Sequence, residues 1–210
     1  MFSDPGKVIE QLYVAEGMTV ADFGAGIGFY ALQLARRVGP YGRVFAIDVD
    51  PDHLRKIKNE AVKEGMNQLE VIQGDLESFK GSGLVSASVD RIVIANVLFQ
   101  SENPKAVVKE AKRILKHSGK IAVVEWVDSF NQIGPHPDHI LTQEDARTIF
   151  ESNGFVLESF IDAGSHHYGL LYVHEPTLVP GEARNMHPEK SKEEINPAMN
   201  IAPEELRNIS

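Results

Sequence analysis

The chain of 210 residues contains no cysteine. Disulfide bonds, thiolate metal sites, iron–sulfur clusters and cysteine nucleophiles are therefore excluded within it. It also has no apolar run that approaches the ~18–20 residues of a membrane-spanning helix. Its first residues, MFSDPGKVIEQLYV, lack the basic and apolar regions of a secretion signal. Together these absences predict a soluble, cytoplasmic protein without a membrane span.

Positive charge is in short supply as well. Lysine and arginine number 21 against 30 aspartates and glutamates, which gives a net charge of −9. An acidic surface repels phosphate backbones, so the charge balance argues against nucleic acid as a partner and favours a small molecule. The composition carries no signature of an oligomeric state.

Short apolar runs alternate with amphipathic segments over the first 175 residues. This alternation is typical of βαβ units in a doubly wound sheet. Strands are expected at 18–23, 43–48, 69–73, 89–95, 120–127, 155–161 and 168–174, and helices at 5–15, 28–38, 51–65, 104–117 and after Thr142. The predicted fold class is α/β: a Rossmann-like, seven-stranded, mostly parallel sheet whose last strand pair is antiparallel.

The last 35 residues have a different composition. Residues 176–210 carry five prolines and no sustained apolar period, which is typical of extended or disordered chain. We therefore expect a folded domain over 1–175 and a Pro/Glu-rich C-terminal tail over 176–210.

The densest motif is the glycine-rich sequence DFGAGIG, from Asp22 to Gly28, which follows the first expected strand and opens a helix. Glycines there allow a sharp turn and a close approach of a ligand to the backbone. The spacing departs from the dinucleotide pattern G-x-G-x-x-G, because Phe29 stands where the third glycine would be. A nicotinamide-dependent oxidoreductase is therefore the less favoured alternative. The acid before the glycines suits a cationic or zwitterionic ligand.

This motif resembles the first motif of class I S-adenosylmethionine-dependent methyltransferases, and four further segments match that family in order. They are VFAIDVDP, which contains Asp48, then Gly74-Asp75-Leu76, then SVDRIVIANVLF, and finally RILKHSGKIAVVEW. The resemblance covers about residues 5–175 and is strongest to the ubiquinone/menaquinone-biosynthesis-like group, methyltransferase types 11 and 25. It implies that S-adenosyl-L-methionine is the cofactor.

The resemblance also implies which residues hold this cofactor. In the family, the acid that ends the second strand binds the ribose hydroxyls, and the acid after the third strand accepts from the adenine amino group. For Asp75 and Asn96, ordinary turn positions remain the alternative, and Tyr13 either covers the cofactor or is a surface residue. The implied cofactor-binding set is Asp22, Gly24, Ala25, Gly26, Gly28, Asp48, Val49, Asp75, Leu76 and Asn96.

The sequence assigns no catalytic residue. Glu125, at the end of the fifth expected strand, is either a base of raised pKa or a structural hydrogen-bond acceptor. His136 and His166 are the other candidate bases, because loops at these places border the acceptor side of this fold. A metal site made of these histidines with Asp138 and His139 is not expected, since H-x-x-H in a proline-rich loop is not a zinc signature.

The function implied by the resemblance is in-line transfer of the sulfonium methyl group to a small-molecule acceptor. Positioning alone can lower such a barrier by ~7–11 kcal/mol, so a general base is not obligatory. The arsenite-methylating branch of the family binds arsenic through cysteines, which this chain lacks. A non-catalytic module that binds S-adenosylmethionine or S-adenosylhomocysteine remains the alternative, and the acceptor and its attacked atom stay open.

Overall fold

The structure is a computed structural model that describes residues 4–129 and 134–175, so the predicted tail over 176–210 lies outside the described residues. The strands are β1 (Thr19–Phe23), β2 (Arg43–Asp48), β3 (Leu69–Gln73), β4 (Val89–Ala95), β5 (Leu115–Trp126), β6 (Phe155–Ile161) and β7 (His167–His174). The helices are α1 (Pro5–Gln11), α2 (Phe29–Val38), α3 (Pro51–Lys63), α4 (Pro104–Ile114) and α5 (Gln143–Glu151), with 3-10 helices η1 (Leu98–Gln100) and η2 (Pro137–His139).

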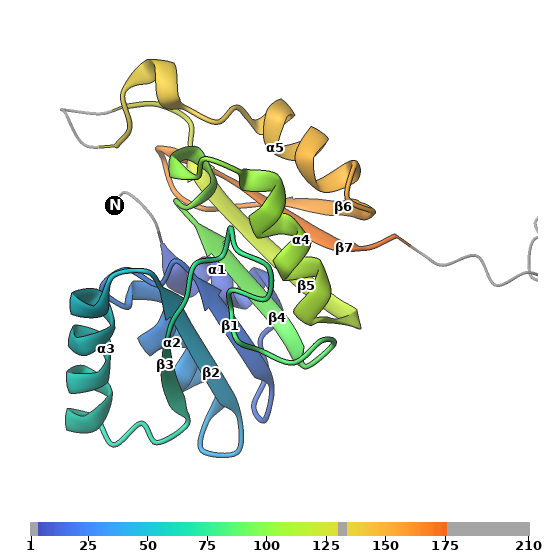
Figure 1. Cartoon of the computed structure of the whole chain (residues 1–210). Helices are drawn as coiled ribbons and strands as arrows, with labels where there is room; N and C mark the ends of the chain where they lie inside the picture. Colours follow the sequence, from blue (N-terminus) through green and yellow to red (C-terminus); the bar gives the residue numbers. More distant parts are fainter. Residues whose placement is uncertain (1–3, 130–133, 176–210) are drawn as a thin grey trace, which may run out of the picture. The chain divides into compact units, whose positions relative to one another are not determined.

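The strands form one sheet in the order β3-β2-β1-β4-β5-β7-β6 (Figure 1). The pairs from β3 to β5 are parallel, whereas β7 runs antiparallel to both β5 and β6. The predicted fold class is confirmed. The strand order reverses between β1 and β4, and ligands of such sheets bind in the crevice at the carboxyl ends of the strands beside that point.

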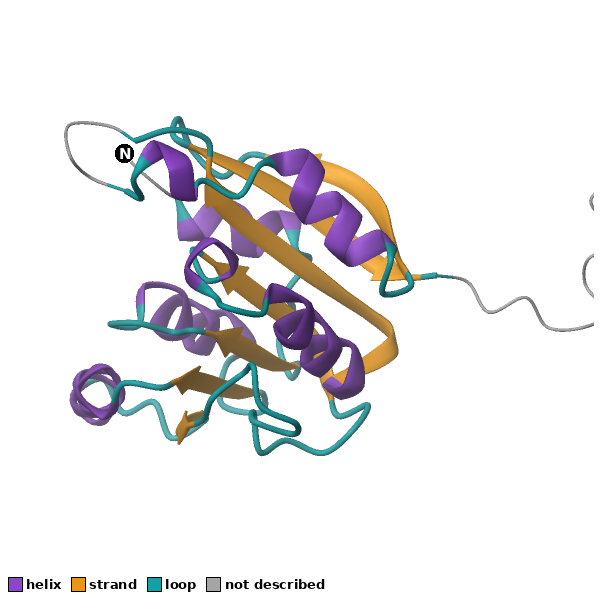
Figure 2. Ribbon diagram, turned by 45° about the horizontal axis from the view of Figure 1, so that its top comes forward, coloured by secondary structure: helices purple, strands orange, loops and turns teal. Residues whose placement is uncertain are grey.

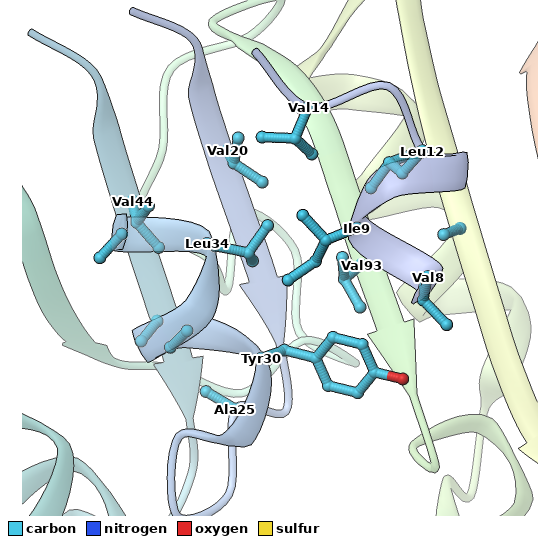
Figure 3. Packing of buried hydrophobic residues seen from close by; sticks show 14 of the residues in the cluster. Val8, Ile9, Leu12, Val14, Val20, Ala25, Tyr30, Leu34, Val44 and Val93 are labelled. Carbon is cyan, nitrogen blue, oxygen red and sulfur yellow. The ribbon is translucent and has the colours of Figure 1, made fainter. Parts of the chain in front are cut away.

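Helices cover both faces of the sheet, as Figure 2 shows. One apolar cluster packs α1, α2 and α3 against side chains such as Val44 and Val93, and a second packs α4 and α5 against side chains such as Phe45 and Ile94. Figure 3 shows Ile9 of α1 and Leu34 of α2 meeting over the first of these faces. Because each inner strand is buried on both faces, its sequence is a nearly continuous apolar run.

The helices begin where side chains cap their first amides. Asp50 Oδ1 accepts from the Asp52 amide at 2.7 Å, and Thr142 Oγ1 accepts from the Asp145 amide at 3.1 Å. Asn103 caps α4 in the same way, and a proline opens α1, α3 and α4. Such caps satisfy donors that have no partner inside a helix, so the predicted starts of α3, α4 and α5 are confirmed.

The predicted boundary between the fourth helix and the fifth strand is wrong. The helix ends at Ile114 rather than near 117, and β5 begins at Leu115 rather than at 120. The Ala87 and Ser88 amides bind the Arg113 and Ile114 carbonyls, which turns the chain into the sheet early. The β4–β5 register then shifts, and residues 116–119 form a bulge that the sequence pattern did not reveal.

The first helix is also shorter than predicted, ending at Gln11 instead of Ala15. Tyr13 has a φ of 56°, a left-handed conformation that stops a helix. Its exposed ring lies 4.8 Å from Lys120 Nζ, where β5 joins the sheet. This is the amino end of the parallel strands, so Tyr13 is a surface residue and the alternative, a cover over the cofactor, is wrong.

Candidate cofactor site

A cleft of about 360 Å³ opens at the carboxyl ends of β1 to β4. Six of the ten residues predicted to bind the cofactor line it: Gly24, Gly26, Asp48, Val49, Asp75 and Leu76. Four others lie behind or beside the lining: Asp22, Ala25, Gly28 and Asn96. The topology therefore brings together segments from three different strand ends.

The three glycines of the loop have different surroundings. A Cβ on Gly24 would lie 2.4 Å from Val97 Cγ2, and one on Gly28 would lie 2.9 Å from Ile57 Cγ1. A Cβ on Gly26 would meet nothing within 4 Å, and Gly26 faces the cleft. All three have positive φ values, of 66°, 53° and 93° in chain order. Gly24 and Gly28 thus allow tight packing, and Gly26 keeps the backbone open to a ligand.

Ala25 and Gly28 shape the loop from behind. The Ala25 amide donates to the Ile47 carbonyl at 2.9 Å, which ties the loop to β2, and the Ala25 side chain is buried. Gly28 is the N-cap residue of α2 and provides no side-chain cap. The first amides of α2 are consequently left to other partners.

Asp48 joins the end of β2 to the glycine loop. Its side chain is nearly buried, with Oδ2 accepting from the Gly26 amide at 2.7 Å and Oδ1 from the Asp50 amide at 2.9 Å. A carboxylate has about four acceptor sites. These two bonds therefore leave acceptor capacity on both oxygens at the edge of the cleft.

Asp75 is an exposed turn residue that lines the cleft. Its Oδ2 accepts from Ser78 Oγ at 2.6 Å and its Oδ1 from the Glu77 amide at 2.9 Å. These bonds, the one from Ser78 above all, lower the pKa of Asp75. The carboxylate is therefore ionised at neutral pH and held in a fixed orientation beside the buried Leu76.

Asp22 lies at the end of β1 beneath the loop and is 2% exposed. Burial raises the pKa of Asp22 to about 8, while a hydrogen bond from the Ala31 amide opposes the rise and the charge of Asp48 adds to it. Within the described part of the chain, its Oδ2 has no hydrogen-bond partner. A cationic group on a ligand would stabilise the ionised form of this carboxyl.

We expect Asp22→Asn to flatten the pH dependence of stability. Because the folded-state pKa is raised from 3.8, the folded state holds a proton that the unfolded chain loses above about pH 4. Stability contributed by this carboxyl is therefore complete at low pH and falls as pH rises toward 8, by up to ~1.4 kcal/mol per pH unit. Urea unfolding at several pH values, followed by Trp126 fluorescence, measures the slope.

The matched control is Asp162→Asn. Asp162 is exposed, and its pKa is lowered by a hydrogen bond from Lys7, so its contribution to stability changes below pH 4. That variant should retain the wild-type slope between pH 4 and pH 8. Equal slopes for wild type and Asp22→Asn would show that Asp22 is ionised throughout this range.

Asn96 directly follows β4 and has a left-handed conformation, with a φ of 58°. Asparagine tolerates this region better than most residues. Its amide donates to the Val124 carbonyl at 2.8 Å, and its Oδ1 is buried with no hydrogen-bond partner among the described residues. Asn96 therefore carries an unused acceptor at the strand end beside the cleft.

The three candidate bases have very different environments. Glu125 is fully buried, and its Oε1 accepts from the Val97 and Leu98 amides, so its contacts are those of a structural acceptor. The His136 side chain, at the N-cap of η2, is 68% exposed. His166 is 21% exposed, and its Nδ1 lies 2.8 Å from Asp128 Oδ1. Of the three, His166 alone combines partial burial with an orienting carboxylate.

The His166–Asp128 pair lies at the same edge of the sheet as the cleft. Asp128 follows the carboxyl end of β5, and His166 precedes the start of the antiparallel β7. β5 neighbours β4, whose last residues lead into the cleft lining. Adjacent strands are ~4.8 Å apart, so the pair is about two strand spacings from the glycine loop.

Sequence reasoning missed several residues of the cleft. His53, in the first turn of α3, has its Nδ1 3.5 Å from Asp48 Oδ1 and its Nε2 3.7 Å from Asp50 Oδ2. The position of His53, five residues after Asp48, was the available signal. The remaining missed lining residues are Asp50, Gly74, Glu77, Val97, Gln100, Ser101 and Val107. Three of them belong to the turn after β4: Val97 lies inside the matching segment SVDRIVIANVLF without having been singled out, and Gln100 and Ser101 follow that segment.

Two further features concern the described residues alone. Over 4–129 and 134–175, no cluster of three or more histidines and acids is arranged to hold a metal ion. Within the same ranges, no helix has the length and apolar character needed to cross a membrane.

The fold and the cleft define a doubly wound domain with an open cleft at its topological switch point, the place where such sheets bind their ligands. Comparison with known proteins then identifies the family. Residues 15–154 match the family model described as a methyltransferase domain, and the chain belongs to this family. The resemblance predicted from the motifs is confirmed, and S-adenosylmethionine is the family's methyl donor.

Three relatives illustrate the similarity. A SAM-dependent methyltransferase from Aquifex aeolicus has a TM-score of 0.74 and 28% identity, covering 81% of this chain and 89% of that one. An arsenite methyltransferase of Halobacterium salinarum is 29% identical over 64% of this chain and 33% of its own length. A demethylmenaquinone methyltransferase of Lactococcus lactis is 25% identical over 57% of this chain and 46% of its own. The chain thus spans less than half of these two curated relatives.

Proposed function

We propose that this chain binds S-adenosylmethionine in the cleft and transfers its methyl group in line to a small-molecule acceptor. The observation that carries the proposal is the open face of Gly26 beside the nearly buried Asp48. A bare backbone next to a fixed carboxylate suits a ligand that approaches closely and donates hydroxyl hydrogen bonds.

Each part of the cofactor has candidate partners in this chain. Asp48, with Val49 beside it, would accept from the ribose hydroxyls, and Asp75 with Leu76 would hold the adenine. The glycine loop, Gly24 to Gly28, would cradle the methionine portion, with Asp22 and Asn96 offering unused acceptors to its ammonium group. The residues present therefore fit the cofactor.

The bound cofactor supplies an electrophilic methyl group on a sulfonium sulfur. The chain aligns the acceptor with that group and excludes water. Such positioning provides most of the expected rate increase. Where the acceptor is a hydroxyl, His166 takes its proton at Nε2 while Asp128 stabilises the imidazolium through Nδ1. The geometry of the pair, 2.8 Å between Nδ1 and Oδ1, supports this role.

The methyl acceptor is a small organic molecule rather than an arsenical or a nucleic acid. This chain has no thiol to bind trivalent arsenic, and its net charge of −9 repels phosphate backbones. One similar protein is named for demethylmenaquinone, a small organic acceptor. We infer an acceptor of this general kind, with a hydroxyl or an activated carbon as the attacked atom.

Calorimetry and a methylation screen test the proposal. The chain is titrated with S-adenosylmethionine, S-adenosylhomocysteine and reduced nicotinamide adenine dinucleotide. In a second experiment it is incubated with radiolabelled methyl donor and a panel of quinols, phenols, sterols and amines. We expect binding of the two sulfur compounds and label in an organic acceptor. Binding without transfer across the panel would favour a non-catalytic binding module, and preferential binding of the nicotinamide would favour an oxidoreductase.

We expect His166→Ala to lower kcat for a hydroxyl acceptor about tenfold or more, with little change in cofactor affinity. His136→Ala is the matched control, since it removes an exposed imidazole at the N-cap of η2, and its kcat should stay within about threefold of wild type. Initial rates at saturating acceptor measure both. A larger loss of kcat in His136→Ala than in His166→Ala would identify His136 as the base instead of His166.

A further inference from the structure

Glu125 is a buried carboxyl that the proposed mechanism does not use. It lies near the end of β5, directly after an apolar run, and its side chain has no exposed surface. It does not line the cofactor cleft. Burying a carboxyl is costly unless it is hydrogen-bonded. Among the described residues Oε2 has no hydrogen-bond partner, so the contacts of Oε1 show what the position requires.

Those contacts are backbone amides at the start of η1. Oε1 accepts from the Val97 amide at 3.0 Å and from the Leu98 amide at 2.7 Å. The first amides of a helix have no carbonyl partner within it, and Val97, the N-cap position of η1, provides no side-chain cap. Glu125 therefore supplies the missing acceptor from a strand 28 residues further along the chain.

The segment that Glu125 caps is a wall of the cleft. We call residues 96–101 the β4 turn. Val97, Gln100 and Ser101 of this turn line the cleft. Val97 also packs on the glycine loop, since its Cγ2 would be only 2.4 Å from a Cβ on Gly24. The position of the turn thus decides the width of the cleft on this side.

The β4 turn is closed within itself and fastened to β5. Gln100 Nε2 donates to the Asn96 carbonyl, and Ser101 Oγ donates to the Val97 carbonyl, each at 2.9 Å. The Asn96 amide donates to the Val124 carbonyl at 2.8 Å. Glu125 adds its two bonds at the neighbouring position, so three hydrogen bonds hold the turn to β5.

We propose that Glu125 is a positioning residue of the cofactor cleft, which holds the β4 turn against the glycine loop from the side away from the ligand. The inference rests on the proposed function, because the ligand of the cleft is taken to be S-adenosylmethionine or its product. The carbonyl oxygen of a protonated carboxyl accepts hydrogen bonds as well. Burial raises the pKa of Glu125 to about 8, and the clamp operates in both protonation states.

Four variants test this role, with S-adenosylhomocysteine affinity measured by calorimetry and stability by urea unfolding. Glu125→Gln keeps an oxygen acceptor and should bind within about threefold of wild type. Glu125→Leu fills the space without an acceptor and should bind about tenfold or more weakly. Glu125→Asp keeps the carboxyl but shortens its reach, and should bind about fivefold or more weakly.

Asp90→Leu is the matched control. Asp90 also accepts from a backbone amide, that of Thr19 at 2.9 Å, and pairs with Lys116, but it lies at the amino end of β4. This variant should lose stability while its affinity stays within about threefold of wild type. It separates general destabilisation from displacement of the β4 turn.

The possible outcomes distinguish the two proposals. Near wild-type affinity in Glu125→Gln together with weakened affinity in Glu125→Asp supports the positioning role, even if Glu125→Leu fails to fold. Wild-type affinity in a folded Asp or Leu variant overturns it and leaves the proposed function intact. Equal losses in Glu125→Leu and Asp90→Leu also overturn it. If the wild-type chain binds neither S-adenosylmethionine nor S-adenosylhomocysteine, both the proposed function and this inference fail.

Discussion

Replacing Asp48 with alanine should weaken the binding of S-adenosylhomocysteine about 100-fold, which corresponds to about 3 kcal/mol. The ligand's hydroxyl donors would lose a charged acceptor, and the Gly26 amide, now bound to Oδ2 at 2.7 Å, would lose its partner. The second loss loosens the glycine loop, so the effect exceeds that of a single hydrogen bond. Calorimetric titration of the two proteins measures the ratio of dissociation constants.

Two companion variants sharpen the interpretation. Asp48→Asn keeps the shape and one carbonyl oxygen but removes the charge, and should bind about tenfold more weakly than wild type. Asp52→Ala removes an exposed acid four residues further on, which is paired with Arg55 on the surface of α3. Its affinity should stay within about twofold of wild type. Wild-type affinity in Asp48→Ala would remove Asp48 from the site.

The second large effect is expected from alanine substitutions at two glycines of the loop. One variant should lose affinity for the ligand, and the other should lose stability. Gly26→Ala places a methyl group in the open side of the cleft, and we expect affinity for S-adenosylhomocysteine to fall about 100-fold or more. The loss of stability should be modest, about 1–2 kcal/mol for a non-glycine residue in the left-handed region. Calorimetry and urea unfolding measure the two quantities separately.

Gly24→Ala should instead give the larger loss of stability. It combines the same backbone strain with a contact of 2.4 Å to Val97 Cγ2, so we expect about 2–4 kcal/mol. Adding Val97→Ala removes the clashing methyl groups and should recover part of that loss. If Gly26→Ala bound the ligand like wild type, the open face of Gly26 would not be where the cofactor approaches.

Much of the fold could be predicted because its inner strands are buried on both faces and its edge strands β3 and β6 are still short apolar runs bounded by turns. The strands 43–48, 69–73, 89–95 and 155–161 begin and end where the apolar pattern predicted. In each case a turn or a capping residue interrupts the pattern sharply. The boundary between α4 and β5 was mispredicted because the segment KHSGK has neither pattern, and pairing with β4 determines its conformation.

The site was predictable only as far as it follows strand ends. The motifs led to Asp48 and Asp75, and both line the cleft. The bond from the Gly26 amide to Asp48 spans 22 residues, and the bonds to Glu125 depend on the register between β4 and β5. Such contacts follow from packing and side-chain rotamers. No local pattern could have shown that Glu125 faces the β4 turn instead of the ligand.

The long sequence separation between Glu125 and the β4 turn has a consequence for the order of folding. Domains generally fold as units, while synthesis delivers the chain from its N-terminus. The glycine loop, Asp48 and Asp75 all emerge within the first 76 residues, yet the turn that completes the cleft gains its cap only when residue 125 has joined the sheet. A nascent chain therefore passes through a stage in which most of its proposed ligand-binding residues have been made but the site is not closed. Ligand binding should stabilise the finished domain without assisting its first half to form.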